Sequence, residues 1–464
     1  WIFIFLMAAG MPVVFALLVG PGLSLAIEGD QVFFKALLSR LYSGMDSFPL
    51  MALPFFILAG QLMNSGGITR SIVEFSQSMI GHVRGGLAQV NILSSVLFAG
   101  LSGSAVADTS ALGKIFIPAM EKSGYSRSFA AAVTAASSVI GPIIPPSGIM
   151  ILYAFIMNVS VAGLFAAGLV PGLMVSIGLM LATSFISKKR NYPVAGRKAT
   201  WRERGQAFRR TALALLTPVI LLGGILAGIF TPTEAAAVAA FYALVVTLFL
   251  TRTLRIKELP SIFIESAVQS GVILLLVGAS VVFAWIITVS GLAGLVANGM
   301  MQTSDNVYIL LFLANLFLFV VGMFLDAGPA VLILGPVLGP LFVAMGVDPI
   351  HFGIIFIVNL EIGYLTPPVG LNLFVASALY EKGLGHIIRS VAPFVGLMLI
   401  GLAIITWYPQ LSVGLGNRIM GDDPMAGSED GEYDSEEEDD SGMPTMEEMM
   451  QEAMAGEDSY DDDD

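Results

Sequence analysis

The chain has 464 residues, of which 56% are hydrophobic and 12% charged, and its mean hydropathy is +0.83. Soluble domains carry about a quarter of their residues as charges, so this composition excludes a soluble protein and indicates a polytopic helical membrane protein. The net charge of −13 misleads, because residues 422–464 hold 20 of the 35 acidic residues. The absence of cysteine excludes disulfides, thiol nucleophiles and cysteine metal sites.

Apolar runs of about 20 residues recur along the chain, and each is long enough to cross a bilayer. We expect spans at 3–22, 48–64, 128–157, 161–187, 211–229, 233–251, 270–289, 350–380 and 390–408. Two other stretches, about 86–120 and 307–346, are too long for one span and have small, polar middles. We expect both to form re-entrant hairpins, because non-helical backbone at membrane depth must be buried in protein or line a wet cavity.

Charge placement orients these segments. The loop 188–210 carries nine basic residues and one acid, so we expect it to be cytoplasmic. The first hairpin then enters from the cytoplasm and the second from the opposite side. The acidic end of the chain has too little apolar content to fold, and we expect a disordered tail.

An internal repeat relates the two hairpins. At an offset of 222 residues, 100–118 aligns with 322–340, and 140–153 (IGPIIPPSGIMILY) aligns with 362–375 (IGYLTPPVGLNLFV). Ten of the 33 aligned positions are identical, where chance at this composition gives roughly two or three. Because the hairpins enter from opposite sides, we expect inverted repeats, with a broken helix in each half (128–157 and 350–380) lining the binding site of a transporter.

The predicted organisation follows from these segments. It comprises an N-terminal scaffold helix and outer loop (1–47), a first repeat (48–187), the basic cytoplasmic loop (188–210), scaffold helices and a connection (211–269), a second repeat (270–410) and the acidic tail (411–464). The expected fold is an all-α polytopic membrane protein.

Two acids lie in the polar middles of the hairpins, Asp108 in the first and Asp326 in the second. A carboxylate in an apolar run marks an ion path or a paired site. A hard cation such as Na⁺ needs about five or six oxygens, which hydroxyls, carboxylates and carbonyls freed at helix breaks supply. We therefore expect one Na⁺ site per repeat.

The ligands expected in the first repeat are Ser102, Gly103, Ser104, Asp108, Thr109 and Pro145, and those in the second are Gly322, Asp326, Thr366 and Pro367. For the substrate we expect Ser147, Gly148, Pro368, Gly370 and Asn372, which lie at the two breaks. The alternative is that small and hydroxyl residues only allow close helix packing and cap the broken ends.

Other polar residues in apolar runs have simpler interpretations. Glu234, in TPTEAAA, is typical of a first-turn acid favoured by the helix dipole. Glu361 precedes the second break and either orders the cavity or binds a ligand. Asn91 and Asn359 favour helix-packing hydrogen bonds. The sequence contains no HExxH, GxSxG or Walker A motif and only three histidines, which argues against an enzyme and against an ATP-driven pump.

Four segments in order resemble the large membrane subunit of a TRAP (tripartite ATP-independent periplasmic) transporter. They are GLSGSAVADTSALGKIFIPAM (100–120), SSVIGPIIPPSGIMILY (137–153), GIFTPTEAAAVAAFYAL (228–244) and EIGYLTPPVGLNLFV (361–375), and the resemblance covers roughly residues 1–410. It implies a sodium-coupled importer of an organic acid, such as sialic acid or a C4-dicarboxylate, in the bacterial inner membrane. It also implies two partners, a periplasmic substrate-binding protein and a small four-helix membrane subunit, and an elevator-type motion of a transport domain past a scaffold.

Three alternatives stay open at this point. A proton-coupled carrier would use the same acids. A passive anion channel could use re-entrant hairpins as a filter, although inverted repeats in one chain favour alternating access. An intramembrane enzyme lacks a nucleophile–base pair. No nucleic-acid partner is expected.

Overall fold

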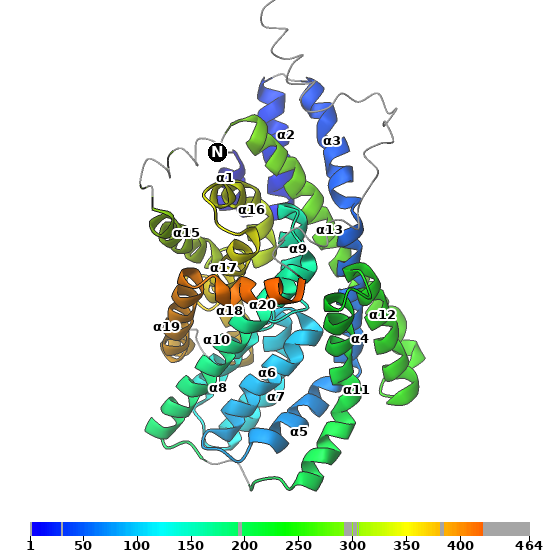
Figure 1. The fold of residues 1–464 in the computed structure, drawn as a ribbon, viewed down its shortest axis with the longest axis vertical. Coiled ribbons are helices and arrows are strands. Elements are labelled where there is room, and N and C mark those ends of the chain that lie inside the picture. Colours follow the sequence, from blue (N-terminus) through cyan, green and yellow to red (C-terminus); the bar gives the residue numbers. More distant parts are fainter. Residues whose placement is uncertain are drawn as a thin grey trace, which may run out of the picture. The chain divides into compact units, whose positions relative to one another are not determined.

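A computed structural model describes residues 2–28, 31–193, 197–291, 299, 304, 306–380 and 385–420. Within these ranges the chain forms helices and no strand (Figure 1), which confirms the all-α prediction. The predicted disorder of 421–464 concerns residues outside these ranges.

The first half of the chain contains α1 (Ile2–Ala8), α2 (Val13–Glu28), α3 (Gln31–Met45), α4 (Ala52–Ser65), α5 (Ile68–Ile80), α6 (Gly86–Ser102), α7 (Ala105–Lys122), α8 (Arg127–Ser138), α9 (Gly148–Met157) and α10 (Val161–Lys189). The second half contains α11 (Trp201–Leu226), α12 (Pro232–Val245), α13 (Leu259–Val289), α15 (Val307–Gly322), α16 (Ala327–Ala344), α17 (Pro349–Gly363), α18 (Leu371–Tyr380), α19 (Gly385–Trp407) and α20 (Gln410–Met420). Two 3₁₀ turns (Phe48–Met51 and Ile256–Glu258) and a π turn (Val246–Leu250) adjoin these helices.

Seven helical segments of the described chain are long and apolar enough to cross a bilayer: Phe48–Ser65, Val161–Lys189, Trp201–Leu226, Pro232–Leu250, Ile256–Val289, Ala327–Ala344 and Gly385–Trp407. The other apolar helices, among them α6, α9, α15, α17 and α18, have 10–17 residues. A span needs about 20 residues, so these helices are short for crossing a bilayer singly. The chain is thus a multi-pass membrane protein.

The first hairpin consists of α6 and α7, which pack against each other (Figure 1). Gly103 ends α6 with a φ of +58°, a left-handed conformation that glycine adopts without a steric cost. Ser104 then caps α7, because its hydroxyl accepts a hydrogen bond from the Ala107 N–H at 3.4 Å. The chain therefore reverses within two residues.

Each repeat also contains a helix interrupted by a pair of prolines. α8 ends at Ser138 and α9 begins at Gly148, and α17 ends at Gly363 and α18 begins at Leu371. The prolines at 145–146 and 367–368, each pair joined by a cis peptide bond, cannot donate the backbone hydrogen bonds of a continuous helix. Both breaks lie where the sequence predicted them.

The repeat extends further than the sequence motifs suggested. The same offset of 222 residues aligns Gly163 with Gly385 and Pro171 with Pro393, so α10 corresponds to α19. Both prolines lie inside their helices. Each repeat therefore comprises a hairpin, a broken helix and a long helix that follows it.

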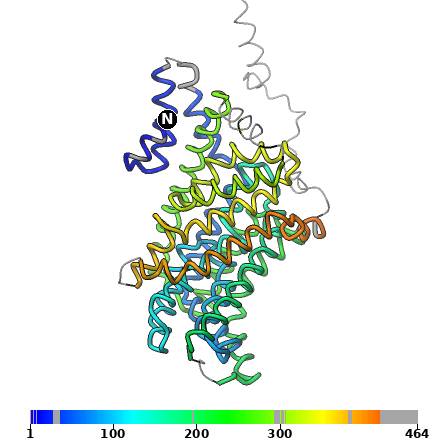
Figure 2. Tube along the Cα trace, turned by 90° about the vertical axis from the view of Figure 1, so that its left-hand side faces the viewer, coloured from blue at the N-terminus to red at the C-terminus, as the bar shows by residue number. Residues whose placement is uncertain are grey.

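The two repeats pack reciprocally. α9 of the first repeat packs against α16 and α17 of the second, and α18 of the second packs against α7 and α8 of the first. The Tyr153 hydroxyl donates to the Pro349 carbonyl at 2.8 Å, and the Asn372 Nδ2 donates to the Ala135 carbonyl at 2.9 Å. In both views the first hairpin lies low in the helical body and the second lies high (Figure 1 and Figure 2).

The N-terminal region differs from the prediction. The expected span 3–22 is two helices, because Gly10 (φ +87°) and Pro12 separate α1 from α2. The expected outer loop 28–47 contains α3, which packs against α13. A Cβ on Gly44 would lie 2.8 Å from the Val281 Cβ, so the two helices approach closely at this glycine.

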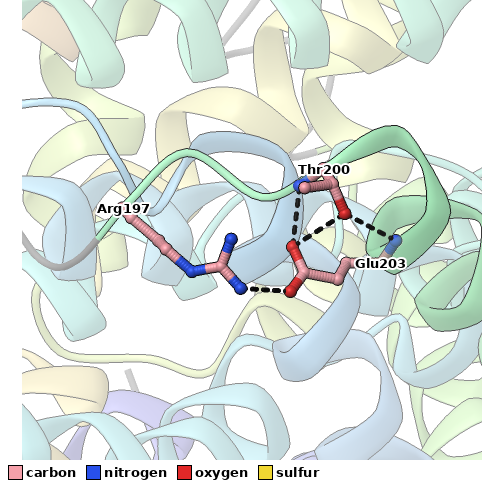
Figure 3. A network of polar contacts seen from close by, with 3 residues as sticks. All are labelled: Arg197, Thr200 and Glu203. Carbon is pink, nitrogen blue, oxygen red and sulfur yellow. Dashed lines mark hydrogen bonds and ion pairs between the residues drawn. The ribbon is translucent and has the colours of Figure 1, made fainter.

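Two polar segments are also helical against expectation. α11 begins at Trp201, inside the predicted loop 188–210, where Thr200 and Glu203 form a capping box and Arg197 forms an ion pair with Glu203 (Figure 3). α20 occupies the predicted start of the tail, packs against α10 and α17, and is joined to α17 by a 2.6 Å hydrogen bond between His351 Nδ1 and the Ser412 hydroxyl.

Candidate ion and substrate site

The first hairpin holds a buried carboxylate. Asp108 lies in the first turn of α7 and is 0% exposed, and its Oδ1 accepts a hydrogen bond from the Ser102 hydroxyl. The Ser102 hydroxyl in turn accepts from the Ser104 N–H at 3.3 Å. Asp108 Oδ2 and the Thr109 hydroxyl are buried without a hydrogen-bond partner. Unpaired oxygens in a bilayer interior indicate a missing ligand or water.

The tip of this hairpin contacts the broken helix of its own repeat. A Cβ on Gly103 would lie 2.9 Å from the Pro146 carbonyl oxygen and 3.4 Å from the Ser147 Cα. A Cβ on Gly141 would lie 2.7 Å from Asp108 Oδ2. Only glycine at 141 lets the carboxylate approach the backbone of the break this closely, and the expected ligand Pro145 lies in the same buried break.

The second hairpin holds an exposed carboxylate. Asp326 occupies the N-cap position of α16 without capping it, and its side chain is exposed. Its Oδ1 accepts a hydrogen bond from the Tyr364 hydroxyl, whose oxygen accepts from the Ala327 N–H. Tyr364 follows the end of α17, so one side chain joins the tip to the break.

The backbone of this tip lies directly against the second break. A Cβ on Gly363 would lie 2.5 Å from the carbonyl carbon of Gly322, and the Gly370 N–H donates to the Met323 carbonyl at 3.2 Å. Thr366 and Pro367 are half-buried, and the Thr366 hydroxyl donates to the Ile362 carbonyl at 3.1 Å. Gly322 and Asp326 of the tip therefore contact the break, at Gly363 and Tyr364.

Glu361 is a third acid. It is 0% exposed, neither carboxylate oxygen has a hydrogen-bond partner, and both Asp326 and Asp108 lie within electrostatic range of it. The described residues contain no group of three His, Asp or Glu side chains arranged to hold a metal ion. The three carboxylates are therefore neighbours rather than ligands of one centre.

The expected substrate residues differ in their exposure and in their hydrogen bonds. Ser147 is 1% exposed, and its hydroxyl accepts from the Met150 N–H at 3.5 Å, so it caps α9 next to the partly exposed Gly148. Pro368 is exposed, whereas Gly370 is buried with a φ of +57°. Asn372 is 0% exposed and binds Ala135 across the repeats, which leaves its Oδ1 unpartnered.

The sequence predicted the roles of some polar residues in and around the site and missed others. Glu234 caps α12 as expected, because its Oε2 accepts from the Thr231 N–H at 2.9 Å. Asn91 and Asn359 make the expected helix-packing bonds, to the Thr134 hydroxyl at 2.6 Å and to Asn315 at 2.7 Å. The sequence analysis did not identify Tyr364, whose only signal is its place between Gly363 and the prolines at 367–368.

The acids of the two repeats are not at equivalent positions. The 222-residue offset aligns Asp108 with Ala330, Asp326 with Ser104, and Glu361 with Val139. The backbone of the site is repeated while its charges are not. The two tips therefore have different chemistry.

Helices broken in pairs beside carboxylates, in a chain of apolar spans, define a polytopic membrane transporter. The model of the family Tripartite ATP-independent periplasmic transporter, DctM component, matches residues 1–411, and the chain belongs to this family.

Relatives with similar sequences carry large-permease names. The chain is 41% identical over 417 residues to the sialic acid TRAP transporter large permease SiaM of Vibrio cholerae, covering 90% of this chain and 97% of that protein. It is 38% identical over 383 residues to the C4-dicarboxylate large permease DctM of Pseudomonas aeruginosa, covering 82% and 90%. It is also 38% identical over 406 residues to the 2,3-diketo-L-gulonate large permease YiaN of Escherichia coli, covering 88% and 95%.

Two solved transporters share the fold. The YdaH transporter of Alcanivorax borkumensis superposes with a TM-score of 0.60 at 17% identity, covering 86% of this chain and 91% of that one. MtrF of Neisseria gonorrhoeae gives a TM-score of 0.56 at 15% identity, covering 81% and 84%. At this identity the likeness concerns the fold alone.

Proposed function

We propose that this chain is the membrane subunit of a sodium-coupled secondary transporter that imports an organic acid across the inner membrane of a bacterium. The observation that carries the proposal is the set of buried, unpartnered oxygens at the first tip, Asp108 Oδ2 and Thr109 Oγ1. Leaving such acceptors unpaired in a bilayer is costly, and a desolvated cation offsets that cost. The substrates in the relatives' names, sialic acid, C4-dicarboxylates and 2,3-diketo-L-gulonate, are organic acids.

Sodium would bind once per repeat. In the first repeat Ser102, Ser104, Asp108 and Thr109 supply side-chain oxygens, and Gly103 and Pro145 supply carbonyls. In the second repeat Asp326 and Thr366 supply side-chain oxygens, and Gly322 and Pro367 supply carbonyls. Each set mixes hydroxyl, carboxylate and carbonyl oxygens, which is the donor chemistry that a hard cation prefers.

The substrate would lie between the tips, at Ser147, Gly148, Pro368, Gly370 and Asn372. Of these, Asn372 has an unpartnered oxygen and a nitrogen already bound to α8, so it would sense the packing of the two repeats as well as the ligand. Sodium bound at Asp108 and Asp326 would also offset the repulsion between these carboxylates and an anionic substrate. Coupling follows, because each ligand favours the binding of the other.

We further propose that inverted repeats carry the site by an elevator-type motion. The reciprocal packing of α9 and α18 supports this, since each broken helix packs against the opposite repeat. The transport domain would include both hairpins and both broken helices. The scaffold would hold a small four-helix membrane subunit, and a periplasmic substrate-binding protein would deliver the acid.

Uptake into proteoliposomes tests the proposal. The chain is reconstituted with its small subunit and loaded binding protein, and radiolabelled sialic acid, succinate and 2,3-diketo-L-gulonate are offered in turn. We expect uptake of one of these acids only with an inward Na⁺ gradient and only with the binding protein. Uptake driven by a pH gradient without Na⁺ would replace sodium by protons. Flux that needs neither gradient nor binding protein would show a channel.

A further inference from the structure

A row of buried polar side chains runs along α6 and α8 below the first tip. The row, here called the polar stripe, consists of Asn91, Ser94 and Ser95 on α6 and Thr134, Ser137 and Ser138 on α8, and all six are 0% exposed. Asn91, Ser95 and Ser102 share one face of α6, by helical spacing. Ser102 donates to Asp108, so the face of α6 that carries the stripe also carries the contact with the buried carboxylate.

The stripe presents oxygen acceptors. The hydroxyls of Thr134 and Ser138 donate to backbone carbonyls of α8, at 2.8 and 2.9 Å, which leaves their oxygens able to accept, and Thr134 already accepts from Asn91 Nδ2 at 2.6 Å. Ser95 and Ser137 bond to each other at 2.8 Å. α6 carries no charged residue, so it brings no cation of its own to these oxygens.

Two of these acceptors have no partner at all. Asn91 Oδ1 and Ser94 Oγ are buried without a hydrogen-bond partner. Asn372 Oδ1, on the neighbouring helix α18, is also buried without one. Ordered water or a cation is the ordinary partner of such groups in a native protein. Acceptors without donors favour a cation and the water that accompanies it.

The second repeat has no equivalent of the polar stripe. There α15 packs against α17 as α6 packs against α8. The 222-residue offset places these residues opposite the six of the stripe, in the same order: Leu313, Leu316, Phe317, Phe356, Asn359 and Leu360. Five of the six are apolar. Leu313, Leu316 and Phe317 are exposed on α15, whereas all six residues of the stripe are buried, so a buried row of this polarity is a feature of the first repeat.

We propose that the polar stripe is a hydrated path along which the coupling cation moves between Asp108 and the Gly86 end of α6. This proposal rests on the sodium coupling proposed above. The basic loop that adjoins this end is predicted to be cytoplasmic, so the path would serve release into the cell.

The cysteine-free sequence allows a direct test. Single variants Asn91→Cys and Ser95→Cys place a thiol in the stripe, and Val90→Cys and Ile92→Cys are matched controls, because both neighbours are 0% exposed on the same helix. The purified full chain in lipid nanodiscs is treated with methanethiosulfonate ethylammonium or with the anionic ethylsulfonate reagent, in Na⁺ or in choline.

We expect the cationic reagent to modify the Asn91→Cys and Ser95→Cys thiols about tenfold faster than the control thiols, because only a hydrated thiol ionises and reacts. The anionic reagent should be slower at both positions, and Na⁺ should slow the cationic one. Equal rates at all four positions would overturn the proposal. Fast labelling that ignores reagent charge and Na⁺ would overturn the cation path as well.

A second variant covers the case in which a cysteine disturbs packing. Asn91→Leu introduces the residue of the second repeat, and in the Ser95→Cys background it should slow labelling by the cationic reagent about tenfold while the protein stays folded. Unchanged labelling would contradict the path. This readout needs neither substrate nor partner, so its failure is distinct from a failure of sodium-driven uptake, which appears only in the proteoliposome assay.

Discussion

The two repeats have the same backbone plan and different chemistry. Each has a hairpin, a proline break and a long helix, yet Asp108 in the first is fully buried while Asp326 in the second is exposed. Both breaks approach the backbone of their hairpin tips, at Gly103 and at Gly363, and the first also approaches a carboxylate, at Gly141. A duplicated frame thus supports one enclosed and one open polar tip.

The largest predicted difference in stability is between alanine substitutions at Gly363 and at Gly141. In Gly363→Ala the new Cβ would lie 2.5 Å from the Gly322 carbonyl carbon, and backbone cannot move aside cheaply, so we expect a loss of about 3 kcal/mol or no folded protein. In Gly141→Ala the neighbour is a carboxylate, which can rotate, so the protein should fold and lose its Na⁺ response.

Thermal unfolding in detergent measures both variants. Gly396→Ala is the matched control, because a Cβ there has nothing within 4 Å and alanine favours the helix by about 1 kcal/mol. Equal unfolding temperatures for Gly363→Ala and Gly141→Ala would contradict the claim that a backbone contact is costlier to disturb than a carboxylate contact.

Tyr364→Phe should have an intermediate effect that is confined to the second repeat. The hydroxyl donates to Asp326 and accepts from the buried Ala327 N–H, so its removal releases the carboxylate and leaves this N–H unpaired at a cost of about 1–3 kcal/mol. Na⁺ titration of the unfolding temperature should show weaker binding. An unchanged titration would mean that the tyrosine does not hold Asp326 for a cation.

The smallest effect concerns the hairpins and the long helices beside them. Asn315 Nδ2 donates to the Thr406 hydroxyl at 3.1 Å, and Ser184, the equivalent of Thr406 in the first repeat, accepts from Gln89 Nε2 at 2.9 Å, which also donates to the Met180 carbonyl. Thr406→Val should cost about 1 kcal/mol. Ser184→Ala should cost less, because Gln89 keeps a second acceptor. Chemical or thermal denaturation measures the stability of both variants, and a larger loss in Ser184→Ala would contradict this account.

The sequence predicts the parts of this fold that depend on local chemistry. Glycine and proline mark both breaks, and the repeat pairs them, so the breaks were predicted, whereas the ends of the short helices were not. Polar or amphipathic helices were missed, because α3 and α20 are held by packing on α13 and on α10. Their residues carry no signal of that contact.

For the site, the sequence identified the acids and not their surroundings. Burial of Asp108 and exposure of Asp326 depend on helices distant in the chain. Glu361 was noticed, yet its place near both hairpin acids is a tertiary property. Tyr364 had no signal beyond its position.

The most direct test of the central claim is the thermal stability of the purified chain in Na⁺ against matched K⁺ or choline. A ligand that binds only the native state stabilises it by about 2.7 kcal/mol at roughly 100 times its dissociation constant. We predict a saturable rise specific to Na⁺, reduced in Asp108→Asn and in Asp326→Asn and absent in the double variant. Equal stability in all three ions, or variants that respond like the parent, would contradict sodium sites at the two tips.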